Sequence, residues 1–331
     1  MKRKFITINK LSKIALFTLI GGILSSYFNF GIITVFFSVV LPILFITNST
    51  IAIHGIFKKK YSNLIGSAFF LILYSFFFQF SFSTNINAKD NISLVTFNVR
   101  SFKQPVTGSP KENAFTEIKK FVDSINPDIL LLQESDYKKG MNISGFSHTF
   151  LGLRENIKKS PMAIYSKYPI INSGFVDFSN TLNNTIYVDI KIKQDTVRVY
   201  NTHLQSFVFA PHIIANKYDD FSYLSNLNNT YTRQIEQAKL VKNHALKSKH
   251  KVIICGDFNA TPYSKPYRIL KKGLNDSFVS KGNGFGATYT SLKYPLRLDY
   301  VLSDKRIVAL FHNNFDLNLS DHEPIFVEFK I

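Results

Sequence analysis

The first 88 residues of this 331-residue chain contain no aspartate or glutamate and consist largely of long apolar runs. Residues 14–57 carry no charged side chain apart from His54. As a single helix this run would be about 66 Å long at 1.5 Å per residue, whereas the hydrocarbon core of a bilayer is ~30 Å thick. Two membrane-spanning helices joined by a turn at Asn29, Phe30 and Gly31 therefore fit better than one. A second uncharged run, residues 61–84, predicts a third span.

A cleavable signal peptide is the competing interpretation of the first run, because basic residues precede an apolar stretch near the N-terminus. The apolar runs that continue beyond it argue against this interpretation, since two spans would remain after cleavage. A buried helix of a soluble protein would not need apolar runs of this length.

Basic residues flank the first two expected spans. Five lie between residues 2 and 13, and three more occupy residues 58–60. Positive residues favour the cytoplasmic side of a membrane, so both clusters are expected there. The third span then delivers the rest of the chain to the opposite side. We expect a multi-pass integral membrane protein with a cytoplasmic N-terminus, a membrane segment over residues 1–84, a linker over 85–90 and an extracytoplasmic domain over 91–331.

The remainder of the chain is moderately basic and has one cysteine. All 22 acidic residues and the other 32 basic ones lie from Lys89 onward. This excess of ten positive charges suits an anionic substrate or surface, although a solvated lysine-rich surface also explains much of it. Cys255 is the only cysteine, so no intrachain disulfide can form. Its apolar neighbours in the sequence predict a buried structural thiol rather than a nucleophile.

The stretch VIICGDFNATP, residues 252–262, is the most informative part of this domain. Its apolar start predicts a buried strand, which ends at Gly256, Asp257 and Asn259. A carboxylate and a carboxamide two residues apart on an extended backbone point to the same side. There one can hold a metal or a water while the other donates to a phosphate oxygen. An ordinary strand-to-turn junction is the alternative, because Gly, Asp and Asn are common in turns.

Similar polar residues follow other predicted strands. Strands are expected over residues 92–98, 128–133, 162–166, 186–192, 197–201, 297–302 and 324–329, and helices over 111–126, 232–247 and the residues after 262. This pattern predicts layered β-sheets with helices outside. Each polar residue alone has a structural explanation, but their joint occurrence at strand ends indicates one site: Asn98, Glu134, His203, Asp257, Asn259, Asp299, Asp321 and His322.

Six short stretches carry a family resemblance: TFNVR (96–100), LLQES (131–135), NTHLQ (201–205), CGDFNATP (255–262), RLDYVL (297–302) and SDHEPI (320–325). In order and spacing they resemble the endonuclease/exonuclease/phosphatase family, which includes DNase I-like nucleases, abasic-site endonucleases, neutral sphingomyelinases and inositol polyphosphate phosphatases. The resemblance extends from residue 91 to the C-terminus. It implies an α+β fold, a DNase I-like four-layer α/β/β/α sandwich, here preceded by transmembrane helices. It also implies hydrolysis of a phosphoester with Mg²⁺ or Mn²⁺.

The resemblance further implies a metal site. Glu134 is expected to be the principal metal ligand, with Asn98 beside it and Asp321 as a possible further ligand. These residue types agree with the preference of hard divalent cations for carboxylate and amide oxygens.

Catalytic roles are implied in the same way for the remaining residues. Asp257 orients or deprotonates the attacking water, and Asn259 holds the phosphate or that water. His322 contacts the scissile phosphate and is oriented by Asp299 through its other ring nitrogen, while His203 is a second phosphate-stabilising donor. Whether Asp257 or His322 is the general base stays open. Arg233, at the start of the helix over 232–247, is expected either to support the site or to lie on the surface.

The substrate is not determined by these stretches. Residues 205–231 form a long expected loop with six aromatic residues, which suits a functional lid, base stacking, a bilayer interface or a small packed cluster. A nuclease-type phosphodiesterase is our first expectation. A phospholipid headgroup phosphodiesterase or phosphatase, sphingomyelinase-like or phosphoinositide-phosphatase-like, is the alternative, with the lipid bilayer as a partner. A non-catalytic membrane-anchored binding module should lack some ligand residues, and none is missing. Nothing in the sequence indicates a protein partner.

Overall fold

The computed structural model describes residues 8–57, 81–83, 91–103, 114–140, 143–155, 157–207, 221–291 and 294–331. These residues belong to two compact units. The N-terminal unit contains α1 (Ile8–Tyr27) and α2 (Ile32–Phe57), which pack along each other. The chain turns between them at Gly31, whose φ of 61° lies in the left-handed region. The turn expected at residues 29–31 is therefore confirmed.

One of these two helices is a candidate membrane span by its length and composition. Within the described chain, Ile32–Gly55 is the helix that is long and apolar enough to cross a bilayer, and the apolar part of α1, Lys13–Tyr27, is shorter. Helices near an N-terminus with this composition also occur in signal sequences. The third expected span, apart from residues 81–83, and the linker over 85–90 lie outside the described residues. The multi-pass topology expected from the sequence thus goes beyond what the described helices show.

Two six-stranded mixed sheets form the second unit. The first has the order β11-β12-β1-β2-β4-β3, and the second has the order β5-β6-β7-β8-β10-β9. The strands of the first sheet are β1 (Ile92–Asn98), β2 (Ile129–Gln133), β3 (His148–Leu151), β4 (Met162–Ser166), β11 (Val308–Asn314) and β12 (Ile325–Lys330). Those of the second are β5 (Ile170–Val176), β6 (Asn184–Ile192), β7 (Asp195–His203), β8 (Lys251–Asp257), β9 (Leu274–Asp276) and β10 (Asp299–Asp304). A parallel pair lies inside each sheet, β1 with β2 and β7 with β8.

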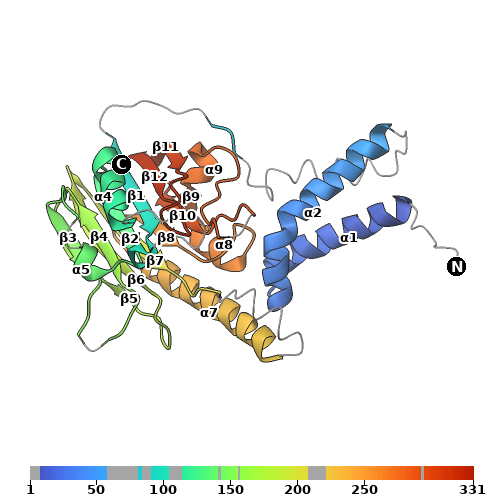
Figure 1. Ribbon diagram of the computed structural model, residues 1–331, viewed down its shortest axis with the longest axis horizontal. Coiled ribbons are helices and arrows are strands. Elements are labelled where there is room, and N and C mark those ends of the chain that lie inside the picture. The colour runs from blue at the N-terminus through green and yellow to red at the C-terminus, as the bar shows by residue number, and fades with distance from the viewer. Residues whose placement is uncertain are drawn as a thin grey trace. The chain divides into compact units, whose positions relative to one another are not determined.

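The sheets pack face to face, with helices on their outer faces (Figure 1). The helical segments of this unit are η1 (Arg100–Phe102), α4 (Ala114–Ile125), α5 (Tyr137–Gly140), α7 (Phe221–Leu246), α8 (Lys265–Lys271) and α9 (Ser277–Lys281). Alternate strand residues such as Leu131 and Val199 fill the core between the sheets. The apolar face of α4 covers the first sheet, and α7 covers the second through Ala238 and Val241. The α+β four-layer sandwich expected from the sequence is confirmed.

Several boundaries differ from the sequence expectation. Helix α7 begins at Phe221 rather than near residue 232, so the last part of the expected loop over 205–231 is helical. Tyr231, one of its aromatic residues, is buried. Residues 208–220, which hold the middle of that loop, lie outside the described chain. Strands β3 and β5 were not expected, because their partly exposed sequences lack a continuous apolar run. Strand β11 was not expected either, although it begins with the apolar run over 308–311.

Candidate active site

The layer between the sheets changes from apolar to polar at one end. Along β8 the inward residues Ile253 and Cys255 belong to the core, and Asp257 follows them with the same orientation. Asp257 pairs in register with His203 of parallel β7 on one side and with Asp299 of antiparallel β10 on the other. Asn98 ends β1 and is also buried. Pairing within the second sheet thus brings together His203, Asp257 and Asp299. Asn98 joins them from the first sheet, where its Nδ2 donates to Asp257 Oδ2 at 3.0 Å.

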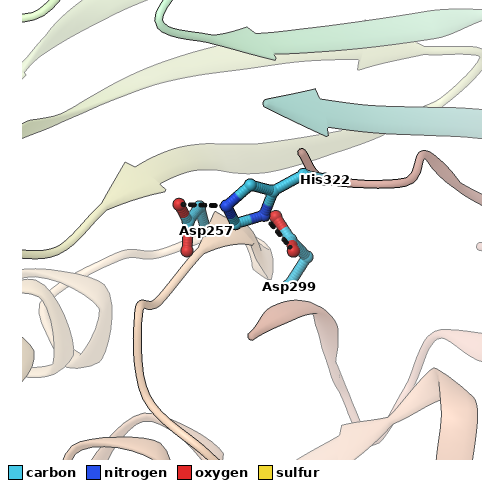
Figure 2. Close-up of side chains that lie close together, drawn as sticks. All are labelled: Asp257, Asp299 and His322. Atoms are coloured by element: carbon cyan, nitrogen blue, oxygen red, sulfur yellow. Dashed lines mark hydrogen bonds and ion pairs between the residues drawn. The ribbon is translucent and has the colours of Figure 1, made fainter. Parts of the chain in front are cut away.

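His322 lies between two of these carboxylates, as Figure 2 shows. Its Nδ1 is 2.7 Å from Asp299 Oδ2, and its Nε2 is 3.6 Å from Asp257 Oδ2. Burial opposes a charge on the ring, but Asp299 and Asp257 raise the pKa of His322 to about 10. The imidazole is therefore a charged donor at neutral pH.

Asp257 is the centre of the cluster. Its Oδ2 accepts hydrogen bonds from Asn98 Nδ2 at 3.0 Å and Asn259 Nδ2 at 3.2 Å, and its Oδ1 accepts one from the Asn259 amide N–H at 2.8 Å. Burial and the neighbouring Asp299 raise the pKa of Asp257 to about 6, against the opposing effects of His322 and His203. Such a carboxylate is ionised at neutral pH yet basic enough to accept a proton.

His203 faces the same carboxylate from β7. Its Nε2 is 3.6 Å from Asp257 Oδ2 and 3.7 Å from Glu134 Oε1. Burial lowers the pKa of His203, so its ring is neutral near pH 7. Neither ring nitrogen makes a hydrogen bond within the described chain, which leaves His203 available to a ligand oxygen.

Two residues of the β8 turn have unusual backbone conformations. Gly256 has a φ of 122°, and a Cβ there would lie 2.2 Å from Thr202 O. Only glycine therefore allows β8 to approach β7 this closely. Asn259 has a φ of 47°, a left-handed conformation that asparagine tolerates better than most residues. This turn carries both Asp257 and Asn259 to the site.

Glu134 is the most open carboxylate of the cluster. Its side chain is 34% exposed, and its polar side-chain neighbours in the described chain are Asn98 Nδ2 at 3.4 Å and His203 Nε2 at 3.7 Å. A carboxylate with such long contacts is available to a cation, so the donor set fits a hard divalent metal. The Asn98 side-chain amide points its Nδ2 toward Glu134, because its Oδ1 accepts a hydrogen bond from the Arg100 backbone N–H at 3.1 Å.

Asp321 lies beside this group and forms an ion pair with Arg100. Its Oδ2 is 3.6 Å from Arg100 Nε, and its Oδ1 accepts from Ser320 Oγ at 3.2 Å. Ser320 Oγ also donates to the carbonyl of Asn98 at 2.8 Å, which ties the approach to β12 to the end of β1.

Asp257, Asp299 and His322 also lie close enough together to hold a metal ion. The short hydrogen bond from His322 Nδ1 to Asp299 uses the ligand atoms that such an ion would need. A charged histidine is moreover a donor and not a metal ligand. We therefore interpret these three residues as a histidine–carboxylate pair facing a carboxylate.

Arg233 does not reach this cluster in the described structure. Its Nη1 is 3.4 Å from the carbonyl of Asn180, at an exposed position. The next residue, Gln234, is fully buried and donates from Nε2 to the carbonyls of Gln205 and Asn259 at 2.7 and 2.8 Å. It links the turn after β8 to the turn after β7. A glutamine on the apolar face of the expected helix was the available signal, but Gln234 was not predicted as a site residue.

Thr288 and Tyr289, which lie beside the Asp299–His322 pair, were also not predicted as part of the site. Thr288 Oγ1 accepts from the backbone N–H groups of Leu298 and Asp299 at 3.0 and 3.1 Å. The ring of Tyr289 packs edge-on against His322, with 5.0 Å between ring centroids. Residues 286–290 follow no apolar period, so nothing in the sequence indicated their position.

Comparisons with known proteins agree with this geometry. A profile described as the endonuclease/exonuclease/phosphatase family matches residues 95–322. Similar solved structures include an endonuclease/exonuclease/phosphatase from Beutenbergia cavernae, at 17% identity and a TM-score of 0.57, covering 73% of this chain and 72% of that one. D. rerio TDP2 complexed with a single-strand DNA product is similar at 15% identity and a TM-score of 0.56, over 73% of this chain and 100% of that one. The human nocturnin catalytic domain with a bound sulfate anion has 16% identity and a TM-score of 0.56, over 75% and 97%.

The search of curated proteins returned no significant match. The family profile nevertheless covers well over half of the chain, including each of the eight site residues identified from the sequence. Enzymes of this family hydrolyse phosphoester bonds and generally depend on a divalent metal. The chain therefore belongs to the endonuclease/exonuclease/phosphatase family and is a phosphoester hydrolase.

Proposed function

We propose that this protein is a Mg²⁺-dependent phosphodiesterase of the nuclease type, anchored in a membrane by its N-terminal helices. The observation that supports it most is His322 held between Asp299 and Asp257. Two neighbouring histidines supply donors for phosphoryl oxygens, and a buried carboxylate supplies a base. Such a site suits attack by water on a phosphodiester.

In this proposal Asp257 orients the attacking water and accepts its proton. Asn259 holds the water or a phosphate oxygen through its side-chain amide, which already contacts Asp257. Charged His322 donates from Nε2 to a phosphoryl oxygen as negative charge develops, and Asp299 keeps the ring oriented and charged. Neutral His203 donates to a second oxygen.

Glu134 is the residue we propose to hold the metal, together with Asn98 and with Asp321 as a further ligand. Mg²⁺ suits this set because it prefers carboxylate and amide oxygens and retains several waters. For Asn98 to bind the metal through Oδ1, its side-chain amide must rotate and give up the hydrogen bond from the Arg100 backbone N–H. When bound, the metal would neutralise charge on the phosphoryl oxygens and activate water.

We further propose the membrane arrangement derived from the sequence. Its parts are a membrane segment over residues 1–84, a linker over 85–90, a catalytic domain over 91–331, a cytoplasmic N-terminus and an extracytoplasmic site. The apolar helix Ile32–Gly55 supports the anchoring. A reporter fused after Ile331 should report the extracytoplasmic side, and a cytoplasmic signal would contradict this topology.

The substrate class is tested by a panel. The full-length chain, purified in detergent, should be assayed with Mg²⁺ against single-stranded DNA, RNA and phospholipids with choline or phosphoinositide headgroups. Cleavage of DNA is expected, because the solved TDP2 structure of the same fold holds a single-strand DNA product. Release of a phosphorylated headgroup or of phosphate, with nucleic acid intact, would replace this proposal by the lipid alternative, which the apolar N-terminal helix favours.

A further inference from the structure

Residues 81–83 are fixed to the turn that follows α9. Ser81 and Gly284 form an antiparallel bridge, with N–H to O=C distances of 3.0 and 2.8 Å. The Ser83 N–H donates to Asn283 Oδ1 at 3.0 Å, and Ser83 Oγ donates to the Ser280 carbonyl at 3.2 Å. These four hydrogen bonds fix where the chain joins the catalytic unit, so this junction is not a loose linker.

Large apolar side chains are exposed around this junction. Phe82 lies between the two bonded serines and is 84% exposed, while Phe285 follows Gly284 and is 45% exposed. Val279, which precedes Ser280 in α9, is also 45% exposed. We call Phe82, Val279 and Phe285 the entry patch. Lys281 is the only charged residue over positions 277–291, so no acidic side chain on this segment opposes an anionic surface.

The chain that leads into the entry patch is itself apolar. Residues 61–80 contain no charged side chain and make up all but the last four residues of the third span expected over 61–84. Residues 81–83 are non-helical and bonded to the turn after α9, so this proposal ends the span at residue 80. Phe82 then lies two residues away, within about 7 Å of extended chain. Aromatic side chains next to a span concentrate at the membrane–water interface.

We propose that the entry patch docks on the surface of the bilayer in which the N-terminal segment is anchored. This inference rests on the membrane anchoring in the proposed function. The occupant of the patch is the phospholipid interface, because Phe82 follows the expected span in the sequence and Lys281 lies between Val279 and Phe285.

Docking there would set the position of the active site relative to the lipid. The segment that starts at Gly284 reaches the site within five residues. Thr288 binds the backbone of Asp299, Tyr289 contacts the His322 ring, and the Thr290 N–H donates to the Asp321 carbonyl at 2.9 Å. The bonded junction and the catalytic pair therefore share one short stretch of chain.

Tryptophan fluorescence tests this proposal directly, because the chain has no tryptophan. Phe285→Trp should be introduced into the full-length chain, reconstituted in phosphatidylcholine vesicles with and without brominated acyl chains. Ile171→Trp is the matched control, since Ile171 is 58% exposed on β5, the edge of the second sheet opposite β9, the edge strand that α9 contacts. We expect bromolipid to reduce the emission of the Phe285→Trp variant roughly twofold and to leave that of the Ile171→Trp variant unchanged, because only an interfacial residue meets the acyl chains. Phe82→Trp should behave like Phe285→Trp.

The possible outcomes separate this proposal from those it rests on. Flotation of the vesicles on a density gradient reports whether the chain is anchored. If the chain floats with the vesicles but neither Phe285→Trp nor Phe82→Trp is quenched, the docking is overturned and the anchoring stands. If the chain does not float with the vesicles, both proposals are overturned. Equal quenching of the Ile171→Trp variant overturns the assignment of a specific patch. Hydrolysis of a soluble phosphodiester by the same samples reports on the proposed activity alone, because none of these positions lies in the catalytic cluster.

Discussion

The hydrogen bond from His322 Nδ1 to Asp299 is the single contact on which the site depends most. Asp299→Asn keeps the side-chain shape but removes the carboxylate that holds the imidazole charged. We expect kcat to fall on the order of 100-fold or more, because an orienting carboxylate supports the developing charge in the transition state. Steady-state kinetics at saturating substrate measure this effect.

Asp304→Asn, at the other end of β10, is the matched control for that variant. Asp304 forms an exposed pair with Arg306 and lies outside the cluster. Its kcat should stay within about twofold of wild type, since exposed ion pairs contribute little. Equal losses in the two variants would mean that a carboxylate anywhere on β10 matters for folding and not for catalysis.

Gly256 is a second residue where the local geometry dictates the amino acid. In Gly256→Ala the new Cβ would meet Thr202 O at 2.2 Å, with φ at 122°. The free energy of unfolding should drop by about 3 kcal/mol or more, since backbone cannot yield as a flexible side chain does. Chemical denaturation measures this change. Gly273→Ala, where φ is 78° and nothing lies within 4 Å, should cost only about 1 kcal/mol.

His312 on β11, outside the catalytic cluster, is expected to make stability depend on pH. It is buried with its Nδ1 2.9 Å from Ser277 Oγ and its Nε2 2.8 Å from Asn314 Oδ1. Burial lowers its pKa from 6.5 to about 4, although the hydrogen bond to Asn314 and the charge of Asp276 oppose the shift and Arg297 adds to it. Below pH 6.5 the unfolded chain therefore binds a proton that the folded chain does not.

Stability should accordingly fall as pH decreases from 6.5 to about 4, by roughly 3 kcal/mol from this residue. His312→Gln keeps a hydrogen-bonding side chain without a titrating ring, so it should flatten the dependence of the unfolding free energy on pH. Urea denaturation at several pH values tests this. His250→Gln serves as the control, and an unchanged slope in His312→Gln would exclude the assignment.

At the scale of elements, α7 organises the site as well as covering its sheet. Gln234 binds the turns after β7 and β8 from this helix, whereas Arg233 reaches an exposed carbonyl. Gln234→Leu should lower the free energy of unfolding by about 1–3 kcal/mol, because two buried carbonyls lose their donor.

The same variant should lower kcat at least tenfold, because Asn259 then loses its backbone support. Arg233→Leu is the control and should retain most activity. A loss in Arg233→Leu as large as that in Gln234→Leu would contradict a specific role for Gln234.

The sequence predicts strands well where their apolar residues form an uninterrupted run. The expected bounds of β1 and β4 agree with the structure, and β8 and β12 differ by a residue, because buried strands are uninterrupted apolar runs. Strand β5 is partly exposed and its middle is polar, so it was not predicted. Strand β11 was not predicted although it begins with the apolar run over 308–311. The start of α7 was not predicted either, although Leu224, Leu227, Tyr231 and Ile235 recur at helical spacing, because its aromatic residues were interpreted as part of a loop.

At the scale of the whole molecule, the sandwich and the convergence of site residues could be anticipated. Strand ends rich in Asn, Asp and His indicated a shared site, and the family resemblance implied the roles of these residues. The strand pairing that places Asp257 between His203 and Asp299 was not predicted. The orientation of Asn98 could not be anticipated, because it depends on the Arg100 N–H. Nor could the bonded junction at Ser81 and Gly284, which joins residues 203 positions apart.

The most direct test of the central claim is metal-dependent turnover by Glu134→Gln. The wild-type chain and this variant should be titrated with Mg²⁺ on a single-stranded DNA substrate, with Glu117→Gln on α4 as the control for a lost exposed carboxylate. We expect wild type and Glu117→Gln to be activated by Mg²⁺ and silenced by chelator. Glu134→Gln should lose at least roughly 100-fold in kcat/KM at every metal concentration, because its ligand for a hard cation is gone. Cleavage by Glu134→Gln that matches wild type, or wild-type cleavage that persists in chelator, would contradict a metal-dependent site at Glu134.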